Sequence, residues 1–174
     1  ERRLNITRQI LQVLLEFRHP VGIVTKSALV ERDLDLLTRL ADDNLVHVTV
    51  SVTTLDRTLA RSLEPRAAAP QRRLQTIRAL SRAGIPVAVL VAPVIPALND
   101  AEIETILHAV REAGASSAGY VMLRLPHEVK ALFRDWLQQY QPLKAERIMR
   151  RVREMRGGRD NDSRFGHRMR GTGA

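Results

Sequence analysis

Several predicted strands of this chain end directly in side chains that could bind a small charged molecule. The stretch VGIVTK ends in Lys26, VHVTVSV contributes Ser51 and is followed by Thr53, and VMLRL contains Arg124. A lysine and an arginine on one rim could bind a carboxylate, and hydroxyl groups could bind the ribose of a nucleoside. These residue types therefore suit a small anionic or zwitterionic ligand.

A further strand end is apolar. The stretch VAVLVAPVIP contains Pro93 and Pro96, which cannot donate ladder hydrogen bonds and therefore end the strand. Ala92, Pro93 and Val94 form a surface on which a flat ring could lie. Polar groups after a strand are also ordinary turn chemistry, so the residues alone leave a ligand site and simple turns as equal alternatives.

The elements that would position these residues alternate along the chain. Apolar residues at helical spacing predict helices over roughly 4–18, 30–42, 70–83, 100–114, 128–139 and 143–156. Short apolar runs between them predict four buried strands: PVGIVTKS, LVHVTVSV, VAVLVAP and GYVMLRL. Asn99 followed by Glu102 predicts a capping box. This order predicts an α/β fold with a parallel sheet, either an open doubly wound sheet or part of a βα barrel.

Composition limits the chemistry. The 174 residues are 44% hydrophobic, which is enough for a real core, and no stretch is long enough to cross a membrane. The chain contains no cysteine, which excludes a thiolate metal site or a cysteine nucleophile within these residues. Its five histidines lack metal-ligand spacing.

The net charge of +9 is uneven. Residues 144–174 contain ten Lys/Arg and four Asp/Glu, and residues 1–143 contain eighteen and fifteen. We therefore expect a body over 1–142 and a basic helix and irregular tail over 143–174. The tail could attract phosphates or simply confer solubility.

Five stretches together resemble radical S-adenosylmethionine (radical SAM) proteins, especially the branch related to spore photoproduct lyase. They read FRHPVGIVTKSALVERDLDLL, VTVSVTTLD, EPRAAAPQRRLQTIRALSRAGIPVAVLVAPVIPALND, AGYVMLRLP and MRGGRDNDSRFGHRMRGTG. The resemblance covers nearly the whole chain, and the stretch from Glu64 to Asp100 is its most specific part. It implies a partial parallel (β/α)6 barrel, with about four consecutive βα units here, followed by C-terminal helices.

The resemblance also implies two cofactors. In the family, a [4Fe-4S] cluster on a C-x3-C-x2-C loop cleaves S-adenosylmethionine to a 5′-deoxyadenosyl radical, which abstracts a hydrogen atom from the substrate. Because the chain has no cysteine, we expect the cluster ligands outside it, in an N-terminal part of the same protein upstream of Glu1. The 174 residues would then be the C-terminal part of an enzyme and inactive alone.

Residue by residue, the resemblance assigns S-adenosylmethionine contacts to this chain. Lys26 resembles the lysine that meets the methionyl carboxylate, Ser51 and Thr53 match a polar strand end at the methionyl group or ribose, and Arg73 resembles a second carboxylate ligand. Arg72 is a competing match for Arg73. The residues expected beside the adenine are Ala92, Pro93, Val94 and Leu125.

The sequence allows more than one substrate and more than one class of protein. The lyase branch implies DNA repair, with DNA or RNA as substrate, a reducing electron donor, no membrane and a cytoplasmic location. One alternative is a non-catalytic basic α/β module that binds nucleic acid. Another is a lyase or aldolase barrel in which Lys26 forms a Schiff base.

Overall fold

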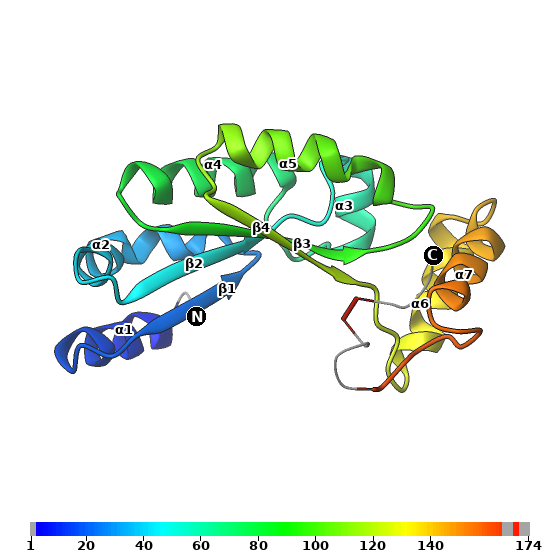
Figure 1. Cartoon of the computed structure of the whole chain (residues 1–174), viewed down its shortest axis with the longest axis horizontal. Helices are drawn as coiled ribbons and strands as arrows, with labels where there is room; N and C mark the ends of the chain where they lie inside the picture. Colours follow the sequence, from blue (N-terminus) through cyan, green and yellow to red (C-terminus); the bar gives the residue numbers. More distant parts are fainter. Residues whose placement is uncertain (1–2, 165–168, 171–174) are drawn as a thin grey trace. The chain divides into compact units, whose positions relative to one another are not determined.

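A computed structural model describes residues 3–164 and 169–170 of the chain (Figure 1). Within these residues, four strands form one sheet in the order β1-β2-β3-β4 and alternate with helices. The elements in chain order are α1 (Ile6–Glu16), β1 (Val21–Thr25), η1 (Ala28–Asp33), α2 (Leu34–Asp42), β2 (Val46–Ser51), α3 (Arg57–Leu63), α4 (Pro70–Arg82), β3 (Val87–Val94), η2 (Asp100–Glu102), α5 (Ile103–Glu112), β4 (Ser117–Met122), α6 (Val129–Tyr140) and α7 (Ala145–Glu154).

All four strands are parallel. β1 pairs with β2 and β2 pairs with β3 in parallel register. The β3–β4 neighbours keep a constant offset, because Ser116 N donates to Val87 O at 2.9 Å and Leu123 N donates to Val94 O at 2.8 Å. The predicted α/β fold with a parallel sheet is therefore confirmed, and it is consistent with a partial βα barrel.

The chain forms two compact units, and the division passes through β3, α5 and β4. The first unit comprises Glu1–Leu90 and Ile106–Gly119, and the second comprises Val91–Thr105 and Tyr120–Ala174. The core of the first unit is aliphatic and includes Leu37, Leu40, Val48, Ile77 and Leu80. In the second unit α6 and α7 bury Phe133, Leu137, Ile148 and Val152.

The sheet of the first unit is covered unevenly. Along β2, Val46, Val48 and Val50 are buried, whereas His47 between them is exposed. β1 lies at the edge of the sheet (Figure 1), and its Val24 is 67% exposed. The expectation of a buried strand at VGIVTK does not hold for Val24, because within the described residues β1 has one strand neighbour and one uncovered face.

The α1 helix is also covered unevenly. The helix predicted over roughly 4–18 is present, and Leu11 is its buried residue, at 2% exposed. Ile10 and Phe17 are 53% and 73% exposed. The apolar period therefore predicted the helix correctly but did not identify which of its apolar residues is buried.

Three local features were not predicted. The α3 helix was missed, although Asp56 caps it by accepting from Thr58 N at 2.7 Å and Leu59 N at 3.3 Å. The Asn99 capping box is wrong: the Asn99 side chain accepts from Ile95 N at 2.7 Å and donates to Pro93 O at 3.0 Å. Asn99 therefore closes the turn after β3. The last strand, β4, begins two residues before the predicted GYVMLRL and ends at Met122.

Two further findings concern membrane-spanning helices and the C-terminal tail. No helix in residues 3–164 is long and apolar enough to cross a membrane. The part of the tail that the structure describes beyond Gly158 contains neither helix nor strand, as expected, and His167 lies outside the described residues.

Candidate functional site

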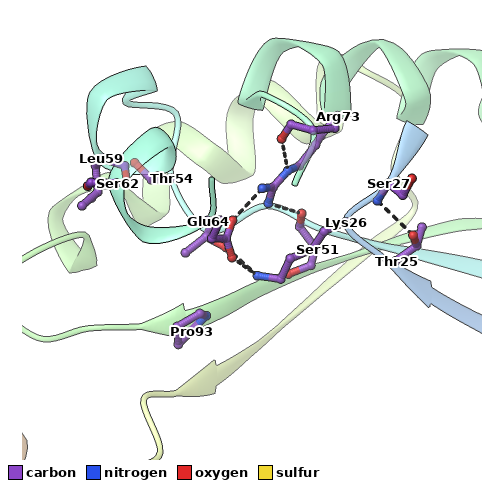
Figure 2. Close-up of polar contacts among 12 residues, drawn as sticks. Thr25, Lys26, Ser27, Ser51, Thr54, Leu59, Ser62, Glu64, Arg73 and Pro93 are labelled. Atoms are coloured by element: carbon purple, nitrogen blue, oxygen red, sulfur yellow. Dashed lines mark hydrogen bonds and ion pairs between the residues drawn. The ribbon is translucent and has the colours of Figure 1, made fainter. Parts of the chain in front are cut away.

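The sheet brings four of the sequence-predicted residues together in the first unit. Lys26 follows β1 directly, Ser51 is the last residue of β2, and Thr53 comes two residues later. Thr25 lies opposite Val50 in the parallel register, so the two strand ends are neighbours. Arg73 reaches the same place from the second turn of α4 (Figure 2).

A carboxylate that the sequence analysis did not single out joins these residues. Glu64, the residue that follows α3, forms an ion pair with Lys26 through Oε1 and with Arg73 through Oε2, the latter at 2.6 Å. Thr53 Oγ1 accepts from Lys26 Nζ at 2.9 Å and donates to Glu64 Oε1 at 2.9 Å. We call Lys26, Thr53, Glu64 and Arg73 the Glu64 cluster, of which Figure 2 labels Lys26, Glu64 and Arg73.

Arg73 is the buried anchor of the Glu64 cluster. Its side chain is 3% exposed, and each of its three nitrogens donates to a protein oxygen. Nε donates to Ala68 O at 2.7 Å, one terminal nitrogen to Ser51 O at 2.9 Å, and the other to Glu64. Lys26, by contrast, keeps a side chain that is 35% exposed. Lys26 is therefore the cation of the cluster that an incoming molecule can reach.

The cluster fixes the charge of Glu64. Burial opposes ionisation of the Glu64 carboxyl, but hydrogen bonds from Lys26 and Arg73 outweigh burial and hold its pKa below the ordinary value of 4.5. At neutral pH, two cations and one carboxylate leave the cluster with one surplus positive charge. That charge suits one further carboxylate.

A pocket of about 460 Å³ opens beside Glu64. Its lining comes from α3 and the start of α4 and includes Arg57, Arg61, Glu64 and residues 67–70. Within the described part of the chain, Arg57 and Arg61 make neither an ion pair nor a side-chain hydrogen bond. The pocket therefore has two arginines without counter-ions among residues 3–164 and 169–170, and it shares Glu64 with the Glu64 cluster.

Other polar residues near the strand ends have local structural roles. Ser27 Oγ accepts from Leu29 N at 3.1 Å and so caps η1. Arg72, the competing match for Arg73, forms two hydrogen bonds with the Glu31 carboxylate at 2.6 Å and 2.7 Å. Arg72 therefore has a carboxylate partner of its own, and Arg73 is the arginine of the Glu64 cluster.

The residues predicted to lie beside adenine belong to the second unit. Val94 and Leu125 are buried at 3% and 2% exposed, and Ala92 and Pro93 are half-buried. Leu125 N donates to Asn161 Oδ1 at 3.3 Å, which ties the segment that follows β4 to the tail. Ala92 and Pro93 are therefore partly accessible, whereas Val94 and Leu125 are not.

Sequence reasoning missed Glu64 because its signal was weak. Glu64 lies in SLEPRAAAP, between a helix that was not predicted and one that was, and a single glutamate before a proline is an ordinary surface residue. The available signal was the helix itself: Asp56 followed by Leu59 and Leu63 at helical spacing. Recognising α3 would have made Glu64 a helix-end residue directed toward the strand ends.

The residues of this chain fit one of the two implied cofactors and not the other. A partly exposed lysine beside buried hydroxyls, with one surplus positive charge, fits the carboxylate end of a small zwitterion. The iron–sulfur cluster does not fit, because the sequence supplies no thiolate. Nor do the described residues contain a group of three or more His, Asp or Glu that could hold a metal ion.

Comparison with known proteins defines the class to which this arrangement belongs. Residues 2–110 match the radical SAM superfamily, so the chain belongs to this superfamily. The matched region contains β1, β2, β3 and every residue of the Glu64 cluster.

Individual relatives are similar over 90 to 157 residues. An uncharacterised protein of Mycobacterium tuberculosis is 32% identical over 157 residues, which cover 89% of this chain and 45% of the relative. A Methanocaldococcus jannaschii protein is 26% identical over 142 residues, covering 82% and 51%. Protein ORF301 of Acidianus two-tailed virus is 40% identical over 90 residues, covering 52% and 29%. The chain thus spans about half or less of the curated relatives it matches.

Proposed function

We propose that this chain binds S-adenosylmethionine for a radical SAM enzyme, with Lys26 as the main contact to the methionyl carboxylate. The observation that carries the proposal is the partly exposed Lys26 of the Glu64 cluster, at adjoining strand ends within the region that matches the superfamily. Ligands of parallel α/β folds bind at the carboxyl ends of the strands.

The other residues have separate roles in this proposal. Ser51 and Thr53 contribute polar groups for the methionyl group or ribose, and Thr53 also orients Lys26 through the 2.9 Å hydrogen bond. Arg73 supports the carboxylate site, because its guanidinium is buried and bonded to Ser51 O and Ala68 O. For the second unit taken by itself, we propose that Ala92, Pro93, Val94 and Leu125 form an apolar surface for an adenine ring.

The cofactors supply the reaction chemistry and the protein supplies position. Bound beside a [4Fe-4S] cluster, S-adenosylmethionine provides the radical chemistry of this superfamily. Since the sequence has no cysteine, we propose that cluster ligands come from another segment of the full-length protein. Within this chain, Lys26 would fix the amino-acid end of the cofactor, and the strand ends would exclude water around it.

The direct test removes the Lys26 ammonium. In the full-length protein, Lys26→Ala should weaken S-adenosylmethionine binding by about 1.5–3 kcal/mol, the scale of a hydrogen bond to a charged group. Isothermal titration calorimetry measures the change. Lys144→Ala, which removes an exposed lysine at the start of α7, is the matched control and should leave the affinity unaltered. Equal affinity of wild type and Lys26→Ala would refute the assignment.

For the substrate, we propose nucleic acid, in a reaction of the spore photoproduct lyase type. The support is the basic C-terminal region, where residues 144–174 carry six more cationic than acidic side chains. A Schiff-base role for Lys26 has less support, since an ammonium paired with Glu64 lacks the lone pair that attacks a carbonyl.

A further inference from the structure

Resting on the proposed function, we propose that Glu64 competes with the ligand's carboxylate for Lys26. When the ligand binds, the Glu64 carboxylate would exchange Lys26 for Arg57 and Arg61 in the neighbouring pocket. Glu64 would then determine how strongly the site prefers a carboxylate-bearing nucleoside over one that lacks the carboxylate.

Glu64 already occupies the position that a ligand carboxylate needs. Its Oε1 pairs with Lys26 and also accepts from Thr53 Oγ1 at 2.9 Å. A second carboxylate arriving at Lys26 would meet this one, and two like charges in a half-buried place repel. Either Glu64 leaves Lys26 or the ligand is held less tightly.

Arg73 does not need Glu64 to stay in place. Two of its nitrogens donate to backbone carbonyls, of Ala68 at 2.7 Å and of Ser51 at 2.9 Å. Those bonds remain when the Glu64 carboxylate turns away. The buried guanidinium therefore keeps its position through the exchange, and its positive charge adds to the attraction for the ligand.

The neighbouring pocket offers other cations to a displaced Glu64 carboxylate. Glu64 lines the 460 Å³ pocket together with Arg57 and Arg61, which lie four residues apart and so on one face of α3. Neither arginine has a counter-ion within the described residues. Because Glu64 directly follows α3, a rotation of its side chain can turn the carboxylate from Lys26 toward these arginines without unfolding a helix.

The experiment compares two probes on the full-length protein. S-adenosylhomocysteine carries the amino-acid carboxylate, and 5′-methylthioadenosine is a related nucleoside without it. Binding of both is measured by calorimetry for wild type, Glu64→Gln, Arg57→Ala/Arg61→Ala, and the combination of all three changes. Arg39→Ala/Arg82→Ala is the matched control, since both arginines are exposed on helices and lack ion pairs within the described residues.

Glu64→Gln should tighten S-adenosylhomocysteine binding by about three- to fivefold, the scale of a partly exposed ion pair. Arg57→Ala/Arg61→Ala should weaken it by a similar factor, because the displaced Glu64 carboxylate loses its two cationic hydrogen-bond donors. In the Glu64→Gln background the arginine changes should have no further effect. 5′-Methylthioadenosine and the control variant should show no change.

Four results would overturn the exchange. Glu64→Gln weakening both probes equally would indicate a purely structural role. Arginine effects that persist in the Glu64→Gln background would mean that Arg57 and Arg61 act independently of Glu64. Unaltered relative affinities in every variant would remove the exchange alone and leave the proposed function intact. A wild-type protein that binds neither probe would overturn both proposals.

Discussion

Glu64 compensates the cost of placing a guanidinium inside the first unit. Arg73 is 3% exposed, and a buried charge without a partner destabilises a protein by several kcal/mol. By bonding to Arg73 with one oxygen and to Lys26 with the other, the Glu64 carboxylate neutralises the buried cation and orients the accessible one. A single side chain thus serves both stability and the candidate site.

This pairing makes stability depend on pH. The folded-state pKa of Glu64 is lowered, so the ion pairs contribute above the unfolded value near 4.5 and are lost as the pH falls through the folded pKa. We expect wild type to exceed Glu64→Gln in unfolding free energy by about 1–3 kcal/mol at neutral pH. The gap should narrow below pH 4.5.

Urea unfolding at a series of pH values measures the gap. Glu104→Gln, at an exposed glutamate of α5, provides the comparison and should track wild type throughout. A gap between wild type and Glu64→Gln that stays constant into the acid range would contradict the role assigned to the ionised carboxylate.

At the level of residues, the sequence allowed the strand-end side chains to be grouped but did not reveal their counter-ion. Lys26, Ser51 and Thr53 could be grouped because parallel strands end at the same edge of a sheet. The counter-ion could not be found, since nothing in the residue type of Glu64 indicates that its carboxylate faces inward. Which distant charges pair depends on how the elements are placed in space. The periodicity of apolar residues does not specify those pairs.

The α3 helix positions Glu64, and its first turn depends on one cap. Asp56 accepts hydrogen bonds from the backbone N–H groups of Thr58 and Leu59. Asp56→Ala should therefore reduce the unfolding free energy by about 1 kcal/mol. Denaturant unfolding measures the loss, and Asp56→Asn, which keeps a capping oxygen, should retain most of the stability. Equal losses in the two variants would mean that the cap is not the cause.

Helices and strands could be predicted where the pattern of apolar residues agrees with the packing in the structure. The alternation of helices and strands was correct, because apolar runs bounded by turn residues have few other solutions in an α/β chain. Burial was predicted less well: Val24 of β1 and Phe17 after α1 are apolar yet largely exposed. Which side of an element is covered depends on its neighbours in space, and the sequence pattern alone does not identify them.

For the molecule as a whole, charge is the property on which the proposed nucleic-acid substrate rests. Glu154 and Asp160 pair with five cations of the last two helices, namely Lys130, Arg134, Arg150, Arg151 and Arg153. Since cations outnumber carboxylates here, we expect binding to single-stranded DNA to weaken as salt rises, with a log–log slope of about −0.7 per phosphate contact.

Fluorescence anisotropy across a salt series tests this expectation. Arg147→Ala/Arg150→Ala on α7 should make the slope shallower, and Arg39→Ala/Arg82→Ala is again a suitable control because those arginines lie on other helices. Binding that does not respond to salt would remove the case for a nucleic acid at this surface.

The connection between α3 and α4 has a mechanical property that follows from its anchors. Glu64 at its start bonds to Arg73 beyond its end, Ala68 O accepts from the same guanidinium, and Ala68 N donates to Lys26 O at 3.3 Å. These links hold the connection at its start and near its middle to one guanidinium, and the backbone bonds of Ala68 keep it in place when the Glu64 carboxylate turns away. The ten residues from 64 to 73 should consequently exchange their amide protons as one cooperative group.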